Sequence, residues 1–252
     1  MKHVLFFCFP SGSARGRHAT CAKARLGRLG PLQAFLCCAH LPSGKLVVGT
    51  ADGHLFLIDD HQRQLEKSVK AHDGFVYAID APWKSFGASS SNNTTANKRS
   101  RVCLLTGSRD GCVKLWSEDL ECLVQFDNKG CGPVRSVALS PCQQRVLVGS
   151  QSAASLREFR ASDGAACGKA LAGSGCAAGE LWALAAHPHE QRVAIASDEG
   201  ALTMWHLEQP NARDARCGAT LLAGACRALA YSPDGKLLAA ALGGPKVASG
   251  GQ

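Results

Sequence analysis

Acidic side chains are missing from the first fifth of this 252-residue sequence. Residues 1–51 contain seven lysines and arginines but no aspartate or glutamate, whereas the rest of the chain is nearly balanced, with 21 basic and 20 acidic side chains. We therefore assign the net charge of +8 to a basic leader, residues 1–33, which we expect to be poorly ordered. Such a leader is either a solvated tail or a contact for an acidic partner. The candidate contact residues are Arg15, Arg17, Lys23, Arg25 and Arg28.

Long apolar runs and sustained helical periodicity are also lacking. No run approaches the roughly 20 residues of a membrane helix, and the apolar stretch at 4–9 is shorter than the core of most signal peptides. No heptad repeat is present, which argues against a coiled coil. Aromatic residues are few, at 6 %, against 27 glycines. This composition favours a turn-rich, all-β protein of the cytoplasm, without a membrane segment.

The thirteen cysteines include no pair in a Cys-x-x-Cys motif. No cysteine or histidine cluster has the spacing of a zinc site, and the His187/His189 pair has no third ligand nearby in the sequence. Most cysteines lie in or beside strand-like segments. We therefore interpret them as reduced packing residues and expect neither a metal nor a cofactor.

Internal repeats carry the fold prediction. Residues 49–58, 107–116 and 196–205 each read as a strand end, an acidic residue followed by glycine, and an alternating strand that closes on a large apolar residue. A degenerate copy lies at 149–159, and the turn glycines lie at 53, 111, 200 and 244. The interval from Gly53 to Gly111 is longer than the others, and a Ser/Asn/Thr-rich insertion at 85–101 accounts for the difference. A period of about 44 residues is typical of WD40 repeats.

The predicted fold is therefore an all-β, WD40-type β-propeller over residues 34–252. We expect four complete four-stranded blades in 34–222 and a broken fifth in 225–252, which gives an incomplete ring. In the third unit, the outermost strand is expected at 168–172.

One repeat contains a full set of residues for a buried hydrogen-bonded relay. His72 precedes the first strand of its unit, Thr106 lies in the second, Asp110 in the tight turn and Trp116 in the third. We expect the imidazole to donate to the carboxylate, while the hydroxyl bridges the imidazole and the indole. The alternative, an acid–base pair of His72 and Asp110, is less favoured because the repeat framework already explains both residues.

Motifs for catalysis are not found. The sequence contains no Gly-x-Ser-x-Gly elbow, no phosphate-binding loop of the Gly-x-x-x-x-Gly-Lys type, and no glycine fingerprint between a strand and a helix. We therefore expect a non-catalytic scaffold without a small-molecule substrate.

Several phrases resemble the echinoderm microtubule-associated protein-like family. They are Lys-Ala-His-Asp-Gly at 70–74, Asp-Gly-Cys-Val-Lys-Leu-Trp at 110–116, Gly-Glu-Leu-Trp at 179–182 with His-Pro at 187–188, and Leu-Ala-Tyr-Ser-Pro-Asp-Gly at 229–235. The resemblance runs from about residue 27 to 244. It implies a cytoskeletal protein that binds tubulin or microtubules, not nucleic acid or a membrane. The family's coiled coil and N-terminal entry motif are not visible, residues 1–26 match nothing in it, and the chain looks like part of a longer protein.

A generic scaffold in a multiprotein complex is the alternative, for instance a substrate receptor of a ubiquitin ligase. The Trp-Asp-x-Arg box of one such group is absent, because Trp116 is followed by Ser117 and Trp205 by His206. The sequence does not identify the surface that contacts the partner.

Overall fold

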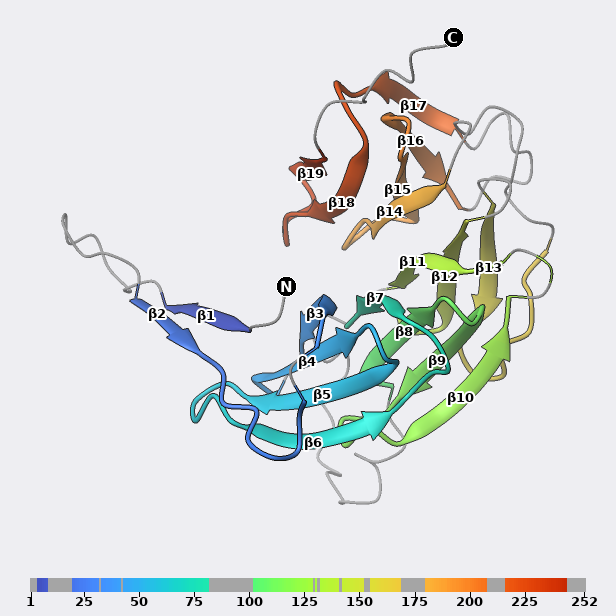
Figure 1. Ribbon diagram of the computed structural model, residues 1–252. Coiled ribbons are helices and arrows are strands. Elements are labelled where there is room, and N and C mark those ends of the chain that lie inside the picture. The colour runs from blue at the N-terminus through green and yellow to red at the C-terminus, as the bar shows by residue number, and fades with distance from the viewer. Residues whose placement is uncertain are drawn as a thin grey trace, which may run out of the picture.

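Antiparallel strands make up every regular element that the structure describes. This computed structural model describes residues 4–8, 20–31, 33–41, 43–81, 102–128, 130, 132–140, 142–151, 155–168, 180–207 and 216–243. No helix occurs among these residues. The all-β prediction is confirmed, and after a two-stranded N-terminal hairpin the strands follow one another in five successive sheets. Figure 1 shows their order.

The sheets follow the chain in order, and each begins at its innermost strand. The first contains β3 (Phe35–His40), β4 (Lys45–Thr50), β5 (His54–Asp59) and β6 (Leu65–Lys70). The second contains β7 (Val76–Asp80), β8 (Leu104–Ser108), β9 (Cys112–Trp116) and β10 (Cys122–Asp127). The third contains β11 (Val134–Leu139), β12 (Arg145–Ser150) and β13 (Leu156–Arg160). The fourth contains β14 (Leu181–Ala186), β15 (Arg192–Ser197), β16 (Ala201–His206) and β17 (Arg216–Leu221), and the fifth β18 (Cys226–Tyr231) and β19 (Leu238–Leu242).

The third sheet differs from the prediction of four strands. It has three described strands, and Ala166 pairs with Phe159 only as an isolated antiparallel bridge. Residues 169–172 of the expected outer strand lie outside the described part of the chain, as do the insertion at 85–101 and Gly244. The fifth sheet has two described strands, as expected of a broken unit.

Tight turns join the second and third strands of the sheets and use glycine where the backbone requires it. Gly53, Gly111 and Gly200 have φ of 86°, 83° and 86°, a conformation that other residues rarely adopt. At Gly53 a Cβ atom would also meet the carbonyl oxygen of His72 at 2.1 Å. These positions explain why the acidic residue–glycine pair recurs along the sequence.

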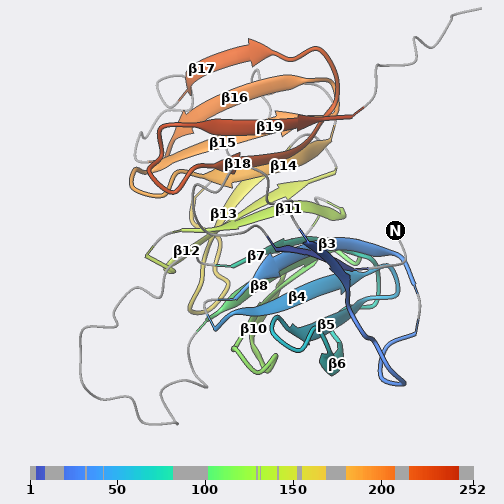
Figure 2. The ribbon, with the colours of Figure 1, turned by 90° about the vertical axis from the view of Figure 1, so that its left-hand side faces the viewer.

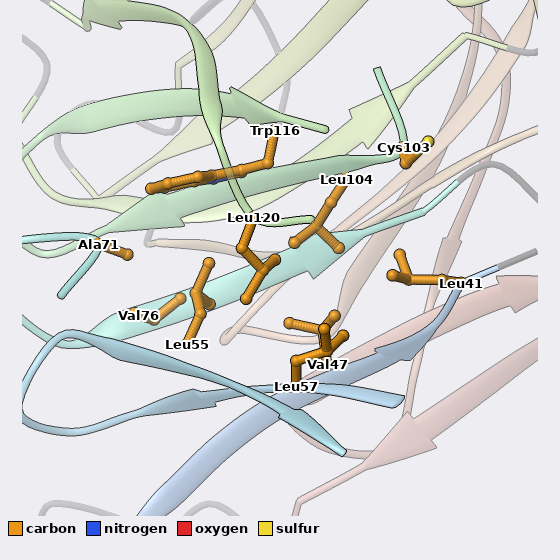
Figure 3. Close-up of a cluster of buried hydrophobic side chains, with 10 residues drawn as sticks. All are labelled: Leu41, Val47, Leu55, Leu57, Ala71, Val76, Cys103, Leu104, Trp116 and Leu120. Atoms are coloured by element: carbon orange, nitrogen blue, oxygen red, sulfur yellow. The ribbon is translucent and has the colours of Figure 1, made fainter. Parts of the chain in front are cut away.

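The core consists of layers between neighbouring sheets. In β5, Leu55 and Leu57 face the second sheet, whereas Phe56 and Ile58 belong to a separate cluster on the opposite face. This alternation follows from the two-residue period of a strand. Figure 3 shows the first layer, in which Val47 and Leu55 of the first sheet pack with Leu104 and other residues of the second.

The five sheets form an arc, and their innermost strands line its inner side (Figure 1). Contacts join β3 to β7, β7 to β11, β11 to β14 and β14 to β18. The described sheets leave the arc open between the fifth sheet and the N-terminal segment (Figures 1 and 2).

The leader, which was predicted to be poorly ordered, contains two described strands. β1 (Leu5–Cys8) and β2 (Thr20–Lys23) form an antiparallel hairpin, which lies against the first sheet (Figures 1 and 2). Phe6 and Ala24 are buried in one cluster with Phe56 and Ile58. The Leu65 N–H donates to the carbonyl of Arg25 at 2.9 Å. The leader therefore covers the face of the first sheet against which no other described sheet packs.

Candidate functional site

The four relay residues come together between the first and second sheets. His72 Nδ1 lies 3.1 Å from Asp110 Oδ2, and His72 Nε2 lies 2.8 Å from Thr106 Oγ1. The indole N–H of Trp116 donates to the same Thr106 oxygen at 2.9 Å. Because a carboxylate only accepts, Nδ1 carries the proton in the neutral ring, and Nε2 accepts from the Thr106 hydroxyl.

Asp110 also forms hydrogen bonds with the backbone of its own turn and of the loop that contains His72. Its carboxylate accepts the backbone N–H groups of Cys112 at 2.8 Å and Asp73 at 3.0 Å. Desolvation raises the pKa of Asp110, but the hydrogen bonds from His72 and these two N–H groups outweigh it and hold the pKa well below its usual range. His72 and Thr106 are buried. Their polar side-chain atoms form hydrogen bonds with each other, with Asp110 and with Trp116. The arrangement is that of a structural relay, with no free base for a substrate.

Other sheets keep only parts of this relay. The fourth sheet keeps the tryptophan, but the Trp205 indole donates to Thr203 of its own strand, β16, at 3.0 Å. In the first, the hydroxyl of Thr50 donates to the turn residue Asp52. The second sheet is therefore the unit in which the described side chains complete the set.

A second feature recurs in all five sheets and was not predicted. The pairing register between the innermost strand and its neighbour shifts at the second residue of the innermost strand, as at a β-bulge. The residues at the shift are Leu36, Tyr77, Arg135, Trp182 and Arg227. Since the innermost strands lie side by side, these five positions form a row along the inner side of the arc.

Four members of this row stack on one another, and we call them the inner ladder: Tyr77, Arg135, Trp182 and Arg227. The Arg135 guanidinium lies 4.2 Å from the Tyr77 ring centroid and 4.7 Å from that of Trp182. Arg227 lies 4.1 Å from the Trp182 ring. Guanidinium groups stack well on aromatic faces, so the ladder joins four sheets through alternating ring and cation.

The ladder is charged and partly open to solvent. Arg135 Nε lies 3.0 Å from Glu180 Oε2, and the two side chains are 13 % and 24 % exposed. Arg227 is exposed. The ladder was not predicted from the sequence, because strand bulges and stacking depend on residues that are neighbours only in space. The only available signal was a large residue that recurs near the start of each innermost strand.

The basic leader residues do not form a compact patch with the relay. Lys23 is the last residue of β2, Arg25 forms an isolated parallel β-bridge with Gln64, and Arg28 lies in the following turn. All three side chains are exposed. Arg15 and Arg17 lie outside the described residues.

Two hollows lie apart from the inner ladder residues. One, of about 880 Å³, is lined by residues including Arg145, Glu158 and Cys167, with Arg145 and Glu158 paired at 2.9 Å. The other, of about 350 Å³, lies beside the relay and is lined by residues including Phe75, Arg109 and Asp110. Neither lining supplies a nucleophile held by a base.

Metal-ligating side chains do not cluster in groups of three within the described residues. His187 Nε2 lies 3.2 Å from the carbonyl oxygen of Gly235, and His189 Nε2 lies 2.9 Å from that of Pro233. This histidine pair therefore ties the fourth sheet to the turn of the fifth. The ten cysteines whose side chains are described are all free. Within the described residues, no helix is long and apolar enough to span a membrane.

Comparison with known families agrees with this geometry. Residues 63–117, which contain the complete relay, match the family model described as WD domain, G-beta repeat. The match concerns the repeat itself, so the finer resemblance to a microtubule-associated family stays a prediction. With its successive antiparallel sheets, the chain is an all-β assembly of propeller blades that contains a WD40 repeat.

Proposed function

We propose that this chain is a non-catalytic scaffold that binds other proteins through the inner side of its arc. The observation that carries the proposal is the inner ladder, in which four sheets hold aromatic and cationic side chains in fixed positions at partly exposed sites. WD40 domains typically bind proteins, and the residues of the relay are occupied by internal hydrogen bonds. Strands position side chains more rigidly than loops do, which suits recognition.

We further propose that the partner is tubulin in polymerised form, with a cytoskeletal location. This finer proposal is supported by the family phrases at 70–74 and 179–182 and by the basic leader. The exposed side chains of Lys23, Arg25 and Arg28 would attract an acidic surface at long range. Such attraction is screened beyond about 10 Å at 0.1 M salt, whereas contacts by the nearly neutral sheets should be less sensitive to salt.

Co-sedimentation with microtubules over roughly 25–300 mM salt tests this proposal. The variant to compare carries Lys23→Gln, Arg25→Gln and Arg28→Gln together. A deletion of the leader is a poor test, because Phe6 and Ala24 are part of the core. We expect the charge variant to bind more weakly at low salt, with a flatter salt dependence and a residual component.

The outcomes separate the two levels of the proposal. Absence of binding by the folded parent chain at low salt would reject tubulin and leave the general scaffold. Complete loss of binding in the charge variant would show that the sheets make no contact of their own, against the proposed role of the arc. A matched control, Lys236→Gln, removes one exposed charge from the β18–β19 turn and should leave sedimentation unchanged.

A further inference from the structure

We infer that the inner ladder binds an extended acidic peptide whose carboxylates occupy alternate positions. The inference deepens the proposed scaffold function, on which it rests, by naming the chemistry of the partner. It starts from the end of the ladder where two guanidinium groups flank one indole. Arg135 reaches Trp182 from β11, and Arg227 reaches it from β18, at 4.7 and 4.1 Å from the ring centroid.

Stacking leaves the edges of the two guanidinium groups available. A guanidinium group has five N–H donors in its plane, and a ring above or below that plane occupies none of them. The Nε side of Arg135 faces Glu180, which leaves its terminal nitrogens. No carboxylate of the described residues lies within ion-pair distance of Arg227, which contacts the Trp182 ring. Oriented guanidinium edges suit carboxylates, which accept two parallel hydrogen bonds.

Spacing indicates how the carboxylates should be arranged. Arg135 comes from the third sheet and Arg227 from the fifth, and their guanidinium carbons lie 4.7 and 4.1 Å from the same ring centroid, so the two carbons are less than about 9 Å apart. In an extended peptide, residues rise about 3.3 Å each and alternate residues face the same side, about 6.6 Å apart. A peptide with carboxylates at every second position can therefore place one at each guanidinium group, whereas adjacent carboxylates face opposite sides.

Nucleic acid fits this site less well, although it is also anionic. Proteins that bind single strands stack the bases on open aromatic faces. The Trp182 ring is flanked by Arg135 and Arg227, and Arg135 also covers Tyr77. The guanidinium groups thus occupy the faces that bases would need, while their own edges remain suited to carboxylates.

The test measures binding of fluorescent twelve-residue peptides by anisotropy at low salt. One peptide repeats Glu-Ser and a second repeats Glu-Glu-Ser-Ser; both contain six glutamates, but only the first has them two residues apart. A repeat of Gln-Ser is the neutral control. We expect the Glu-Ser peptide to bind several-fold tighter than Glu-Glu-Ser-Ser and the neutral peptide not to bind.

Variants at the exposed end of the ladder locate the site without disturbing the core. Arg227→Gln should weaken binding of the Glu-Ser peptide at least about tenfold, since it removes a charge-assisted pair. Arg227→Lys keeps the charge but loses the planar fork, and should give an intermediate loss. Lys236→Gln removes the same charge from the other end of the fifth sheet and should change affinity less than about twofold.

Four results would overturn the inference: equal binding of the two glutamate peptides, binding of the neutral peptide, equal losses in Arg227→Gln and Lys236→Gln, or tighter binding of a twelve-residue oligothymidylate. Parallel microtubule sedimentation of the same variants separates this inference from the proposed function. Sedimentation without peptide binding rejects the acidic-peptide site and keeps tubulin, whereas peptide binding without sedimentation does the reverse.

Discussion

At Thr106 one hydroxyl oxygen is hydrogen-bonded to both a histidine and a tryptophan. In the fourth sheet Ile195 stands at the position of Thr106, and the Trp205 indole donates instead to Thr203 of its own strand, β16. The second sheet also has His72 in the preceding loop and Asp110 in the turn. The fourth sheet has Glu199 at its turn, and Glu199 is exposed.

Replacing Asp110 by Ala should lower the free energy of unfolding by about 1–3 kcal/mol. The change removes the acceptor for His72 and for two backbone N–H groups, and unpaired buried donors cost about this much. Chemical denaturation followed by fluorescence measures the effect. The matched change Glu199→Ala should alter stability by less than about 0.5 kcal/mol. Equal stabilities of Asp110→Ala and the parent chain would contradict the relay.

Asp80 should make stability depend on pH in the direction opposite to most carboxylates. Desolvation raises its pKa from 3.8 to about 6, although the N–H of Leu139 donates to it at 2.7 Å. A raised folded-state pKa favours the protonated form, so this contribution is complete below about pH 4 and is lost as the pH rises through 6. Asp80→Asn should therefore stabilise the protein at pH 7.5 by about 1–2 kcal/mol, allowing for solvent screening.

The comparison of Asp80→Asn with the parent at several pH values is the measurement. The stability difference should shrink towards zero at pH 4, where both side chains are neutral. A difference that stays constant between pH 4 and 7.5 would show that Asp80 titrates as an ordinary surface carboxylate.

At the residue scale, the relay could be predicted and the ladder could not. His72, Thr106, Asp110 and Trp116 lie at characteristic places within a repeat, so their residue types alone indicated their contacts. The stacking of Arg135 on Trp182 depends on a register shift in each of two neighbouring strands, and no local pattern reports such a shift. The raised pKa of Asp80 likewise comes from burial in the assembled sheets, which outweighs the opposing hydrogen bond from Leu139 on the next sheet.

At the scale of elements, the fit between neighbouring sheets depends on the penultimate residue of each second strand. This residue is Gly49, Gly107 or Gly149 in the first three sheets and Ala196 in the fourth. A Cβ at Gly107 would lie 2.4 Å from Val134 Cγ1 of the next sheet. Ala196 is tolerated in the fourth sheet, where the smaller Cys226 stands at the position of Val134.

Gly107→Ala should therefore destabilise the protein by about 1–3 kcal/mol through overpacking. Val134→Cys copies the pairing found between the fourth and fifth sheets. It should be less harmful in the Gly107→Ala background than in the parent, because it removes the Cγ1 atom that clashes. Thermal denaturation of the four proteins completes this double-mutant cycle. Strictly additive effects of the two substitutions on stability would mean that the side chains at positions 107 and 134 do not clash.

The order and spacing of the strands could largely be read from the repeats, but the outer strand of the third sheet could not. Its expected segment begins at Gly168, after the Ala166 bridge to Phe159. Gly168 has φ of 76°, a turn conformation that does not continue a strand. The weak alternation of outer strands gives little information on where pairing stops.

For the molecule as a whole, the leader takes the place of a neighbouring sheet. Phe6 and Ala24 cover Phe56 and Ile58, which would otherwise face solvent at the end of the arc. This role of the leader could not be predicted from the sequence, because the apolar residues at 4–9 resemble an incomplete signal peptide and their charged surroundings indicate a tail. Their role depends on a sheet face that only the assembled arc leaves uncovered.

Phe6→Ser should lower stability by about 2–4 kcal/mol, because the side chain is 7 % exposed and leaves a cavity when it is shortened. The triple charge variant at Lys23, Arg25 and Arg28 is the matched control from the same segment and should change stability by less than about 1 kcal/mol. Calorimetry distinguishes the two. A Phe6→Ser protein as stable as the parent would mean that the hairpin is only loosely attached.

The covered first sheet also gives the arc a direction. At the opposite end, Leu221, Leu237 and Leu242 are 78 %, 71 % and 46 % exposed, and the outer edge of β19 has no described partner strand. Two ends that both exposed apolar sheet faces could join head to tail, copy after copy, into an open filament. With the leader on one end, such growth has no acceptor. We therefore expect the hairpin to prevent this head-to-tail association, and we expect a chain whose hairpin is detached to self-associate.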